Sequence, residues 1–386
     1  MKTKNDNKNL NVPNLRFPEF DGEWEKVTLS KVVTRITRKN KNNESRLPLT
    51  ISAQYGLVDQ ISFFNKVVAS ADMSNYYLLK EGEFAYNKSY SSEYPWGAIK
   101  RLDRYPKGAL SSLYICFGIN DNIDSDFIMH YFESSKWHRE VSNIAGEGAR
   151  NHGLLNIAVG DFFNTAHYIP SNNKEQQKIA ALINLITVRI DTQIKIIEDL
   201  KKLKSAIRAK LYLQIENTCE SNIEIRDMLN YEQPSKYIVK STEYSDQYKT
   251  PVLTANKAFI LGYTDEEFGI YDKGECIILD DFTMDVKFVS FPFKVKSSAI
   301  KILTPKADVD LYFIYEYIQY LDLVAEEHKR HYISEIEPIS IAYISFDEQC
   351  KISNALRFID KQIENANSIL LLCNKQKQYL LSQMFI

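Results

Sequence analysis

The polar side chains that could do chemistry in this sequence favour binding over catalysis. The sequence contains no GxxxxGK(S/T) phosphate-binding loop, no Asn/Asp-Pro-Pro-aromatic motif and no HExxH zinc motif. Its 6 histidines are scattered and its 5 cysteines never form a CxxC pair, so we expect buried free thiols rather than a zinc site or a disulfide framework. What remains is short clusters of Lys, Arg, Asn, Gln, Ser and Thr. We therefore predict that the chain is not an enzyme.

Several of these clusters in the first half suit a nucleic-acid ligand, because Lys and Arg pair with phosphates while amides and hydroxyls hydrogen-bond to base edges. The cluster that contains Arg35, Arg38 and Lys39 could equally be a solvated loop. The cluster from Asn87 to Tyr90 could be a plain hairpin turn. The cluster from Arg150 to His152 lies between Gly148 and Gly153, which would let its backbone approach a ligand closely, although a flexible loop explains it too. The candidate DNA contacts of the first half are Arg35, Arg38, Lys39, Gln54, Asn87, Lys88, Ser89, Tyr90, Arg150, Asn151 and His152.

The second half is acidic: residues 217–346 hold 22 acidic against 13 basic residues, whereas the whole chain has a net charge of −2. An acidic total does not exclude DNA, since the field at the contact face matters more, but it predicts reliance on base contacts. Asp280 and Asp281 would repel phosphate, yet could accept from a cytosine amino group. Lys287, Lys294 and Lys296 could face phosphates or protect a strand edge. The candidate DNA contacts of this half are Asn256, Lys257, Thr283, Lys329, Arg330 and His331.

These clusters need a frame, and the strongest structural signal in the sequence is a pair of long helices. Apolar residues recur at alternating steps of four and three, first from Ile179 and again, 173 positions later, from Ile352, which is the spacing of a coiled-coil seam. Ser171 and Asp347 are the expected N-caps. The residues predicted to form the two seams, or to contact a partner there, are Ile179, Ile183, Ile186, Ile190, Ile197, Leu200, Ile352, Leu356, Ile359, Ile363, Leu370 and Leu380.

Each seam also contains one lysine, Lys204 or Lys377, at equivalent positions near the far end of its helix. We interpret them as side chains that extend their ammonium groups to solvent at a fraying end. The alternative is a polar key that fixes the register of the helices. Apolar residues off the seam could instead dock helices of a partner; they are Ala181, Leu182, Val188, Ile194 and Ile196.

The helices belong to a unit that the sequence contains twice. Gly82-Glu83 has its counterpart in Gly274-Glu275, and DSDFIMHYF from Asp124 has its counterpart in DLYFIYEYI from Asp310. An ordered series of such matches indicates a duplication.

We predict an α+β fold with two β-rich domains joined by two long antiparallel coiled-coil helices, related by a pseudo-two-fold axis. In the alternative, each helix packs separately on its own domain. The expected boundaries are a flexible N-terminal segment 1–14, a first domain 15–173, a first helix 174–216, a second domain 217–346 and a second helix 347–386.

With this order of domains and helices, the chain resembles the specificity subunit (HsdS) of type I restriction–modification systems. The local sequence fits as well: PNLRFP before Trp24, the run from Gly146 to Leu154, and GECIILDDFT from Gly274 resemble segments of that family. The counterpart of the second segment, HKRHYI from His328, departs from its Gly-rich form.

The resemblance implies two target-recognition domains that each read one half of a split, asymmetric sequence in double-stranded DNA, with the coiled coil setting the spacing. It implies that two modification (methyltransferase) subunits dock on the helices and that restriction/translocase subunits join them, in a complex that methylates adenine and cleaves DNA. S-adenosylmethionine, ATP and Mg would then be bound by the partner subunits, and none by this chain. The alternative from another class is a non-enzymatic protein–protein scaffold with paired domains on a coiled-coil spacer.

Hydropathy bears on the compartment. No apolar run approaches the roughly 18 residues that a membrane-spanning helix needs. The first residues also lack the apolar region of a signal peptide. We therefore expect a cytoplasmic protein with no membrane partner.

Overall fold

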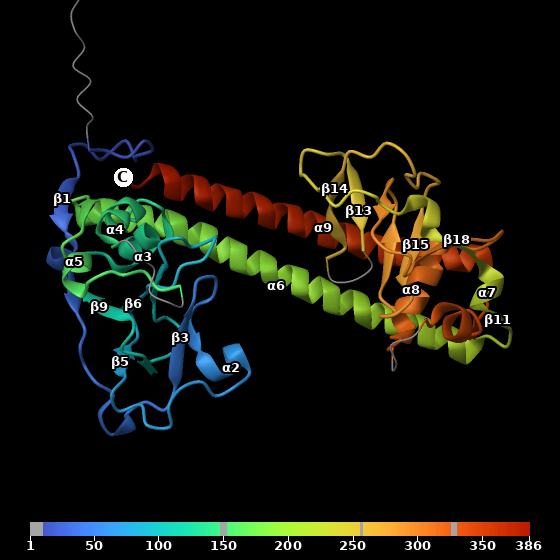
Figure 1. Ribbon diagram of the computed structural model, residues 1–386, viewed down its shortest axis with the longest axis horizontal. Coiled ribbons are helices and arrows are strands. Elements are labelled where there is room, and N and C mark those ends of the chain that lie inside the picture. The colour runs from blue at the N-terminus through green and yellow to red at the C-terminus, as the bar shows by residue number, and fades with distance from the viewer. Residues whose placement is uncertain (1–10, 147–152, 255–257, 326–329) are drawn as a thin grey trace, which may run out of the picture. The chain divides into compact units, whose positions relative to one another are not determined.

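The computed structural model describes residues 11–146, 153–254, 258–325 and 330–386. The chain divides into two compact units, which we call unit 1 (Met1–Gln193 with Ile369–Ile386) and unit 2 (Ile194–Ser368) (Figure 1). Each unit combines small β-sheets with short helices and with parts of both long helices. The predicted α+β class, with two β-rich domains and two long helices, is confirmed.

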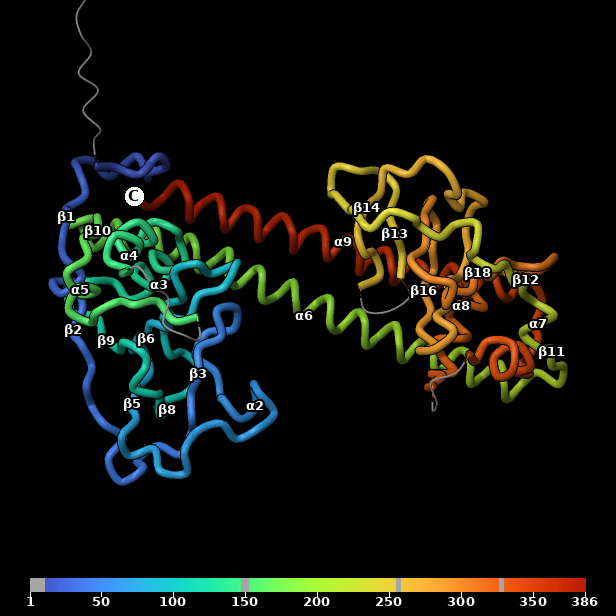
Figure 2. The backbone as a smooth tube through the Cα atoms, in the orientation of Figure 1, coloured from blue at the N-terminus to red at the C-terminus, as the bar shows by residue number. Residues whose placement is uncertain are grey.

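Unit 1 contains two four-stranded sheets and one two-stranded sheet. The four-stranded sheets have the strand orders β2-β9-β6-β7 and β4-β3-β8-β5, and the second contains one parallel pair, β3 with β8. β1 pairs with β10, so that the beginning and end of the domain lie side by side (Figure 2). The strands are β1 (Glu25–Thr28), β2 (Val33–Arg35), β3 (Pro48–Ser52), β4 (Gly56–Asp59), β5 (Tyr77–Lys80), β6 (Phe84–Asn87), β7 (Ala98–Arg101), β8 (Lys107–Leu110), β9 (Ile115–Ile119) and β10 (Ala166–Ile169), and the helices are α1 (Leu29–Val32), α2 (Gln60–Phe64), α3 (Ser125–Glu133), α4 (His138–Ile144) and α5 (Val159–Phe163).

Unit 2 contains one four-stranded, one three-stranded and one two-stranded sheet. Their strand orders are β12-β18-β15-β16, β14-β13-β17 and β11-β19. The strands are β11 (Asn222–Glu224), β12 (Leu229–Glu232), β13 (Thr250–Leu253), β14 (Ile260–Thr264), β15 (Cys276–Asp280), β16 (Val286–Val289), β17 (Lys294–Val295), β18 (Ile300–Pro305) and β19 (Ser340–Ala342), and the helices are α7 (Ile225–Met228) and α8 (Leu311–Leu321), followed by a short π-helical turn, η3 (Tyr332–Ile336).

The strand pairings of unit 2 repeat those of unit 1. The order β12-β18-β15-β16 corresponds to β2-β9-β6-β7, and the terminal pair β11-β19 corresponds to β1-β10. The parallel pair β13-β17 takes the place of β3-β8. Parallel neighbours require a crossover connection rather than a hairpin, so the recurrence of this one pair at the same place confirms the duplication.

The long helices are α6 (Asn173–Thr218) and α9 (Phe346–Gln383). Every residue predicted for the two seams is buried or half-buried. In unit 1 the first turns of α6, at Ile183, and the last turns of α9, at Leu380, enter one hydrophobic core. In unit 2 the last turns of α6, at Tyr212, share a core with the first turns of α9, at Leu356. Within each unit the start of one helix therefore packs with the end of the other, against the alternative of two independently packed helices.

The N-caps of the long helices differ from the predicted ones. Asn172, not Ser171, caps α6, and its side-chain oxygen accepts from the amide of Lys174 at 3.0 Å. Ser345, not Asp347, caps α9: its hydroxyl and its amide both donate to the carboxylate of Glu348, at 2.6 and 3.1 Å. A Ser followed three residues later by Glu is the sequence of a capping box, and the bond from the Ser345 amide to the Glu348 side chain is the half of it that is formed here.

A buried glutamine explains why the two helix starts are so similar in sequence. The side-chain oxygen of Gln176 accepts from the amide of Asp124 at 2.8 Å, and its nitrogen donates to the carbonyl of Pro170 at 2.9 Å. Gln349 repeats this with the amide of Asp310, at 2.9 Å, and the carbonyl of Ile344, at 3.0 Å. Asp124 and Asp310 are the N-caps of α3 and α8. One amide thus fixes each long helix to a short helix of its own unit.

Candidate nucleic-acid interface

In unit 1 two candidate segments, distant in sequence, are joined by backbone hydrogen bonds. The segment that follows β6 runs beside Gly153–Leu155: the amide of Tyr90 donates to the carbonyl of Gly153 at 3.0 Å, and the amide of Leu155 donates to the carbonyl of Lys88 at 2.9 Å. Gly153 adopts a φ of +72°, which a glycine reaches without strain. The structure thereby places Asn87–Tyr90 beside the residues that follow Arg150–His152. Arg150, Asn151 and His152 themselves lie outside the described residues.

In the segment Asn87–Tyr90 one side chain shapes a turn and another is exposed. The side-chain oxygen of Asn87 accepts from the amide of Ser89 at 3.0 Å, which shapes the backbone after the strand. Lys88 reaches the carbonyl of Ile157 at 3.5 Å. The ring of Tyr90 is exposed. The exposed ring can contact a ligand without a large rearrangement, whereas Lys88 is half-buried.

The other candidates of unit 1 lie on different elements. Arg35 ends β2 and is exposed, and Gln54 is exposed in the turn between β3 and β4. The guanidinium of Arg38 donates to the carboxylate of Glu83 at 2.6 Å and to the carbonyl of Leu78 at 2.9 Å. The ammonium of Lys39 donates to the carbonyl of Asn75 at 2.8 Å and lies over a tyrosine ring. Arg38 and Lys39 thus have partners within the unit, which reduces the charge that they offer to phosphate.

In unit 2 the candidate Thr283 lies exposed in the turn between β15 and β16. The carboxylate of Asp280 accepts from the amides of Phe282 and Thr283, at 2.9 and 3.0 Å, and this fixes the turn. Met284 has a positive φ of 59° and a buried side chain in the core of the unit. The hydroxyl of Thr283 is oriented by a hydrogen bond to Asp285 at 3.0 Å. The candidates Asn256 and Lys257 lie outside the described residues.

The segment that contains Arg330 is bonded to the start of the same turn. The amide of His331 donates to the backbone carbonyl of Asp281 at 3.0 Å. The ring of His331 is buried and its Nδ1 bonds to Glu335 at 2.7 Å, which favours a structural role for it. The guanidinium of Arg330 is more than half exposed and can reach a ligand. Lys329 lies outside the described residues.

The two units therefore bring their candidate segments together at corresponding places. In each, the chain that leaves the central strand, β6 or β15, is hydrogen-bonded to a second segment from much further along the sequence. The predicted correspondence between Arg150–His152 and His328–His331 falls mostly outside the described residues and stays a prediction.

The expectation that Lys294 faces phosphate or protects a strand edge is wrong. Its side chain is fully buried, its ammonium pairs with Glu266 at 3.0 Å, and it donates to the carbonyl of Phe268 at 2.6 Å. Asp281 is also buried, so it cannot accept from a base in this conformation. Sequence reasoning considered Asp281 as a base contact and missed its buried ion pair with Lys301. Lys301 stands between apolar residues of β18, and such a lysine needs a buried partner, which was the available signal.

The seam lysines are paired with acidic groups, which corrects the interpretation that they extend to solvent. Lys377 pairs with Glu133 at 3.0 Å in unit 1, and Lys204 pairs with Glu316 at 2.6 Å and with Asp360 at 2.7 Å in unit 2. The carboxylates of Glu133 and Glu316 lie on α3 and α8, so each lysine ties a long helix to the short helix of its unit. This agrees with the alternative of a polar register key.

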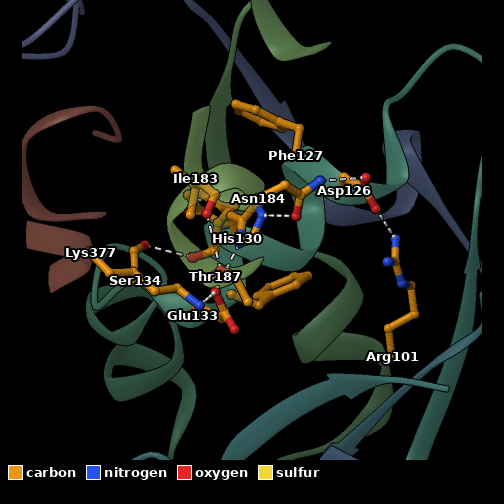
Figure 3. Close-up of polar contacts among 12 residues, drawn as sticks. Arg101, Asp126, Phe127, His130, Glu133, Ser134, Ile183, Asn184, Thr187 and Lys377 are labelled. Atoms are coloured by element: carbon orange, nitrogen blue, oxygen red, sulfur yellow. Dashed lines mark hydrogen bonds and ion pairs between the residues drawn. The ribbon is translucent and has the colours of Figure 1, made fainter. Parts of the chain in front are cut away.

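A hydrogen-bonded chain extends from the lysine in unit 1 (Figure 3). The ring of His130, which is buried, bonds to Glu133 at 2.9 Å and to Asn184 on α6 at 2.8 Å. Asn184 donates to Asp126, which in turn accepts from Arg101. Burial opposes ionisation of Glu133, but the hydrogen bond from His130 and the charge of Lys377 outweigh it and lower the pKa of Glu133 to about 2. Glu133 is therefore a permanent negative charge at neutral pH.

Part of the outer surface of both helices is apolar. Among the off-seam residues expected to dock partners, Val188, Ile194 and Ile196 are exposed, as is Ala181, whereas Leu182 is half-buried and packs against the core of unit 1. Further large apolar side chains are exposed on the helices; they are Leu185, Leu203, Leu213, Phe358, Ile369, Leu371, Leu372 and Tyr379.

Metal ligands and cysteine thiols were the remaining candidates for chemistry. No cluster of three or more His, Cys, Asp or Glu side chains suitable for a metal occurs there. The cysteines of that part are free thiols, and burial raises the pKa of Cys116 and of Cys276 to about 12, which disfavours the reactive thiolate. Of the helices described, none is both long and apolar enough to span a bilayer.

The chain is a duplicated α+β protein in which two β-rich units share two long helices. No family model matches the chain. It is 47% identical over 118 residues to the specificity subunit of the type I restriction enzyme EcoR124I/EcoR124II from Escherichia coli. That match covers 29% of this chain and 29% of the relative, so the chain spans less than a third of the length of the curated relative that it matches.

The likeness to solved structures covers nearly the whole chain. The type I restriction–modification S subunit from M. genitalium superposes with a TM-score of 0.61 at 17% identity, covering 97% of this chain and 99% of that one. A chain from a structural study of complex assembly and conformational transition in the type I restriction–modification system gives a TM-score of 0.56 at 13% identity, over 94% and 97% of the two chains. These comparisons confirm the resemblance to type I specificity subunits and the fold that it implies.

Proposed function

We propose that the chain is the specificity subunit of a type I restriction–modification enzyme, and that each unit binds one half of a split target in duplex DNA. The observation that supports this most is the repeated join of two polar segments at the end of a central strand, β6 in unit 1 and β15 in unit 2. Duplicated sites with different side chains suit an asymmetric target, because each half-site then meets its own set of donors and acceptors.

The two units would contribute differently to DNA binding. In unit 1, the exposed ring of Tyr90 and the half-buried Lys88 lie on the joined segment, so an aromatic group would meet the ligand next to a lysine. In unit 2, the exposed guanidinium of Arg330 and the oriented hydroxyl of Thr283 suit base edges. The acidic surroundings of unit 2 weaken phosphate attraction. Unit 2 should therefore contribute more to the sequence specificity of the chain than to its nonspecific affinity for DNA.

The exposed apolar side chains of α6 and α9 are the proposed docking surface for two modification subunits. Val188, Leu185 and Leu372 are examples of large side chains that would otherwise remain in water. In this proposal the partner subunits bind S-adenosylmethionine, ATP and Mg, and the chain itself catalyses nothing. The restriction/translocase subunits would join after modification subunits are bound, and the helices would set the gap between half-sites.

The decisive experiment is to express the chain with its cognate modification subunits and to sequence the methylated DNA of the host. A split, asymmetric methylated motif is expected. Fluorescence anisotropy with random duplex should in addition show salt-sensitive binding that sharpens to that motif when the modification subunits are present. Complex formation without DNA binding would overturn the proposal in favour of a protein–protein scaffold.

A further inference from the structure

The buried carboxylate of Asp281 lies where the two candidate segments of unit 2 meet. Asp281 directly follows β15, and Thr283 is two residues further along the same turn. Arg330 comes immediately before His331, whose amide bonds to Asp281. Both candidate ligand contacts are thus within a short reach of one side chain that is itself 1% exposed.

Each oxygen of this carboxylate has a separate partner set. Oδ1 accepts from the amide of His331 at 3.1 Å and from the amide of Tyr332 at 2.8 Å. These are the first amides of η3, so Asp281 caps that turn from another part of the chain. Oδ2 pairs with the ammonium of Lys301 at 3.1 Å. The carboxylate therefore holds the segment after Arg330 with one oxygen and the sheet with the other.

Lys301 makes this arrangement possible without a net buried charge. Its side chain is 2% exposed, and its ammonium also donates to the hydroxyl of Tyr231 on β12 at 3.0 Å. Arg330 is further away, with Nε 3.9 Å from Oδ2, and stays more than half exposed. Because Lys301 neutralises Asp281, the guanidinium of Arg330 does not have to, and it remains available for a ligand.

The corresponding place in unit 1 is built differently. There Ser89 stands in the bridge to Leu154, and the segments are held by hydrogen bonds between backbone groups. A buried ion pair costs desolvation that a backbone bridge does not. In unit 2 the carboxylate adds to the backbone hydrogen bond between His331 and Asp281, so the segment there is held by side-chain as well as backbone groups.

We propose that Asp281 is the positioning residue of the DNA-reading surface of unit 2: it fixes Arg330 and the Thr283 turn relative to each other, with Lys301 as its buried counter-charge. This rests on the proposed function and deepens it, because it assigns the base selectivity of one half-site to a residue that does not itself touch DNA. The acceptor oxygen Oδ1, rather than the charge, is the feature that orients Arg330.

Two double variants separate the acceptor from the charge. D281N/K301M and D281A/K301M both lack the ion pair, but only the asparagine retains an oxygen that can accept from His331 and Tyr332. Each is assembled with the modification subunits, and the methylated motif, the affinity for duplexes altered in either half-site, and thermal unfolding are measured. D281A/K301M is expected to lose about tenfold or more of its discrimination in one half-site, the value of a base contact, with the other half unchanged. D281N/K301M is expected to keep the wild-type motif.

Equal weakening of both half-sites, or an unchanged motif in D281A/K301M, would overturn the positioning role. Failure of D281A/K301M to assemble, while D281N/K301M assembles normally, would also count against it, since the acceptor would then serve folding alone. Loss of one half-site in both variants would overturn the assignment to the oxygen. Failure of the proposed function itself is distinct, because the wild-type complex would then yield no split motif.

Discussion

Unit 1 and unit 2 each contain a lysine at the equivalent position of a long helix, but its acidic partners differ between the units. Lys377 meets Glu133, which is shared with His130, whereas Lys204 meets the fully buried Glu316 together with Asp360. The helix positions are retained and the residues of the short helices have changed around them. This comparison indicates that the register of the helices is the constant part of the duplication. In both units a carboxylate from the short helix faces the lysine.

The same contrast holds between the frame of each unit and its candidate DNA-binding segments. Gln176 and Gln349 make the same pair of hydrogen bonds in both units. The joined segments are linked by backbone hydrogen bonds in both units, and in unit 2 the carboxylate of Asp281 adds two side-chain bonds. Conservation of the frame with divergence of the segments is what two different half-sites require.

The largest expected effect comes from removing the lysine of unit 2. Lys204→Met should lower the free energy of unfolding by about 4 kcal/mol, because among the described residues it leaves the buried Glu316 with Arg208, at 3.3 Å, as its one basic partner. Lys377→Met is the matched variant and should cost less, since Glu133 keeps its hydrogen bond to His130. Urea unfolding monitored by circular dichroism measures both. Equal losses would show that the two lysines are equivalent after all.

Acid should weaken unit 1 through Glu133. The pKa of this group in the folded state, about 2, lies below the roughly 4.3 of an unfolded glutamate, so its stabilisation is complete above the unfolded value. It is lost as the pH falls from about 4.5 toward 2 and amounts to at most about 3 kcal/mol. Urea unfolding of wild type and Glu133→Gln at several pH values in this range measures it. The difference between the two proteins should shrink as the pH falls, and a constant difference would contradict the assignment.

The buried glutamines should be equivalent. Gln176→Ala and Gln349→Ala each remove two buried hydrogen bonds and leave the amide of Asp124 or of Asp310 without its acceptor, so each should cost about 2 kcal/mol. Thermal unfolding of both variants, compared with the surface variant Gln177→Ala, is the measurement. A loss confined to one of them would break the correspondence between the helix starts.

Arg330 should matter for sequence preference rather than for folding. Arg330→Ala is expected to weaken binding of the methylated target by roughly 1–3 kcal/mol and to relax one half-site, as loss of a base contact does. Arg226→Ala is the matched control: it is an exposed arginine of unit 2 that pairs with Glu224. Anisotropy and methylation sequencing of both variants test this. An unchanged target in Arg330→Ala would remove it from the interface.

The smallest effect is expected at Lys39. Its ammonium already donates to Asn75 and lies 4.3 Å from the centre of the Tyr77 ring, so Lys39→Ala should change DNA affinity by less than about 0.5 kcal/mol. The salt dependence of binding should also stay the same. A shallower slope of affinity against salt would instead place Lys39 on a phosphate.

Periodicity was sufficient to predict the helices but not what their polar residues contact. The seam from Ile179 and its repeat from Ile352 could be predicted because a buried helix face needs apolar residues at fixed steps. The partners of Lys204 and Lys377 could not, because Glu316 and Glu133 are brought to them by tertiary packing. Gln176 and Gln349 occupy equivalent positions in the sequence, 173 residues apart, although the bonds that explain them depend on the N-caps of α3 and α8.

The candidate interface was the less predictable part for a related reason. Asp280 and Asp281 are adjacent and chemically alike, yet one shapes the turn at the surface and the other is buried against Lys301. Which of two neighbours turns inward is decided at the end of β15, where strand alternation stops being a guide. The join between Asp281 and His331 depends on a contact between segments about 50 residues apart, which local sequence does not encode.

The backbone of Met284 has a consequence for engineering. A side chain other than glycine at a φ of 59° is disfavoured locally, and here burial of that side chain in the hydrophobic core of unit 2 compensates. The shape of the turn that presents Thr283 is therefore a property of the surrounding protein rather than of its own six residues. A short graft of Asp280–Asp285 onto another scaffold should lose that shape, so transplanting this specificity would require the β15–β16 hairpin together with the core beneath it.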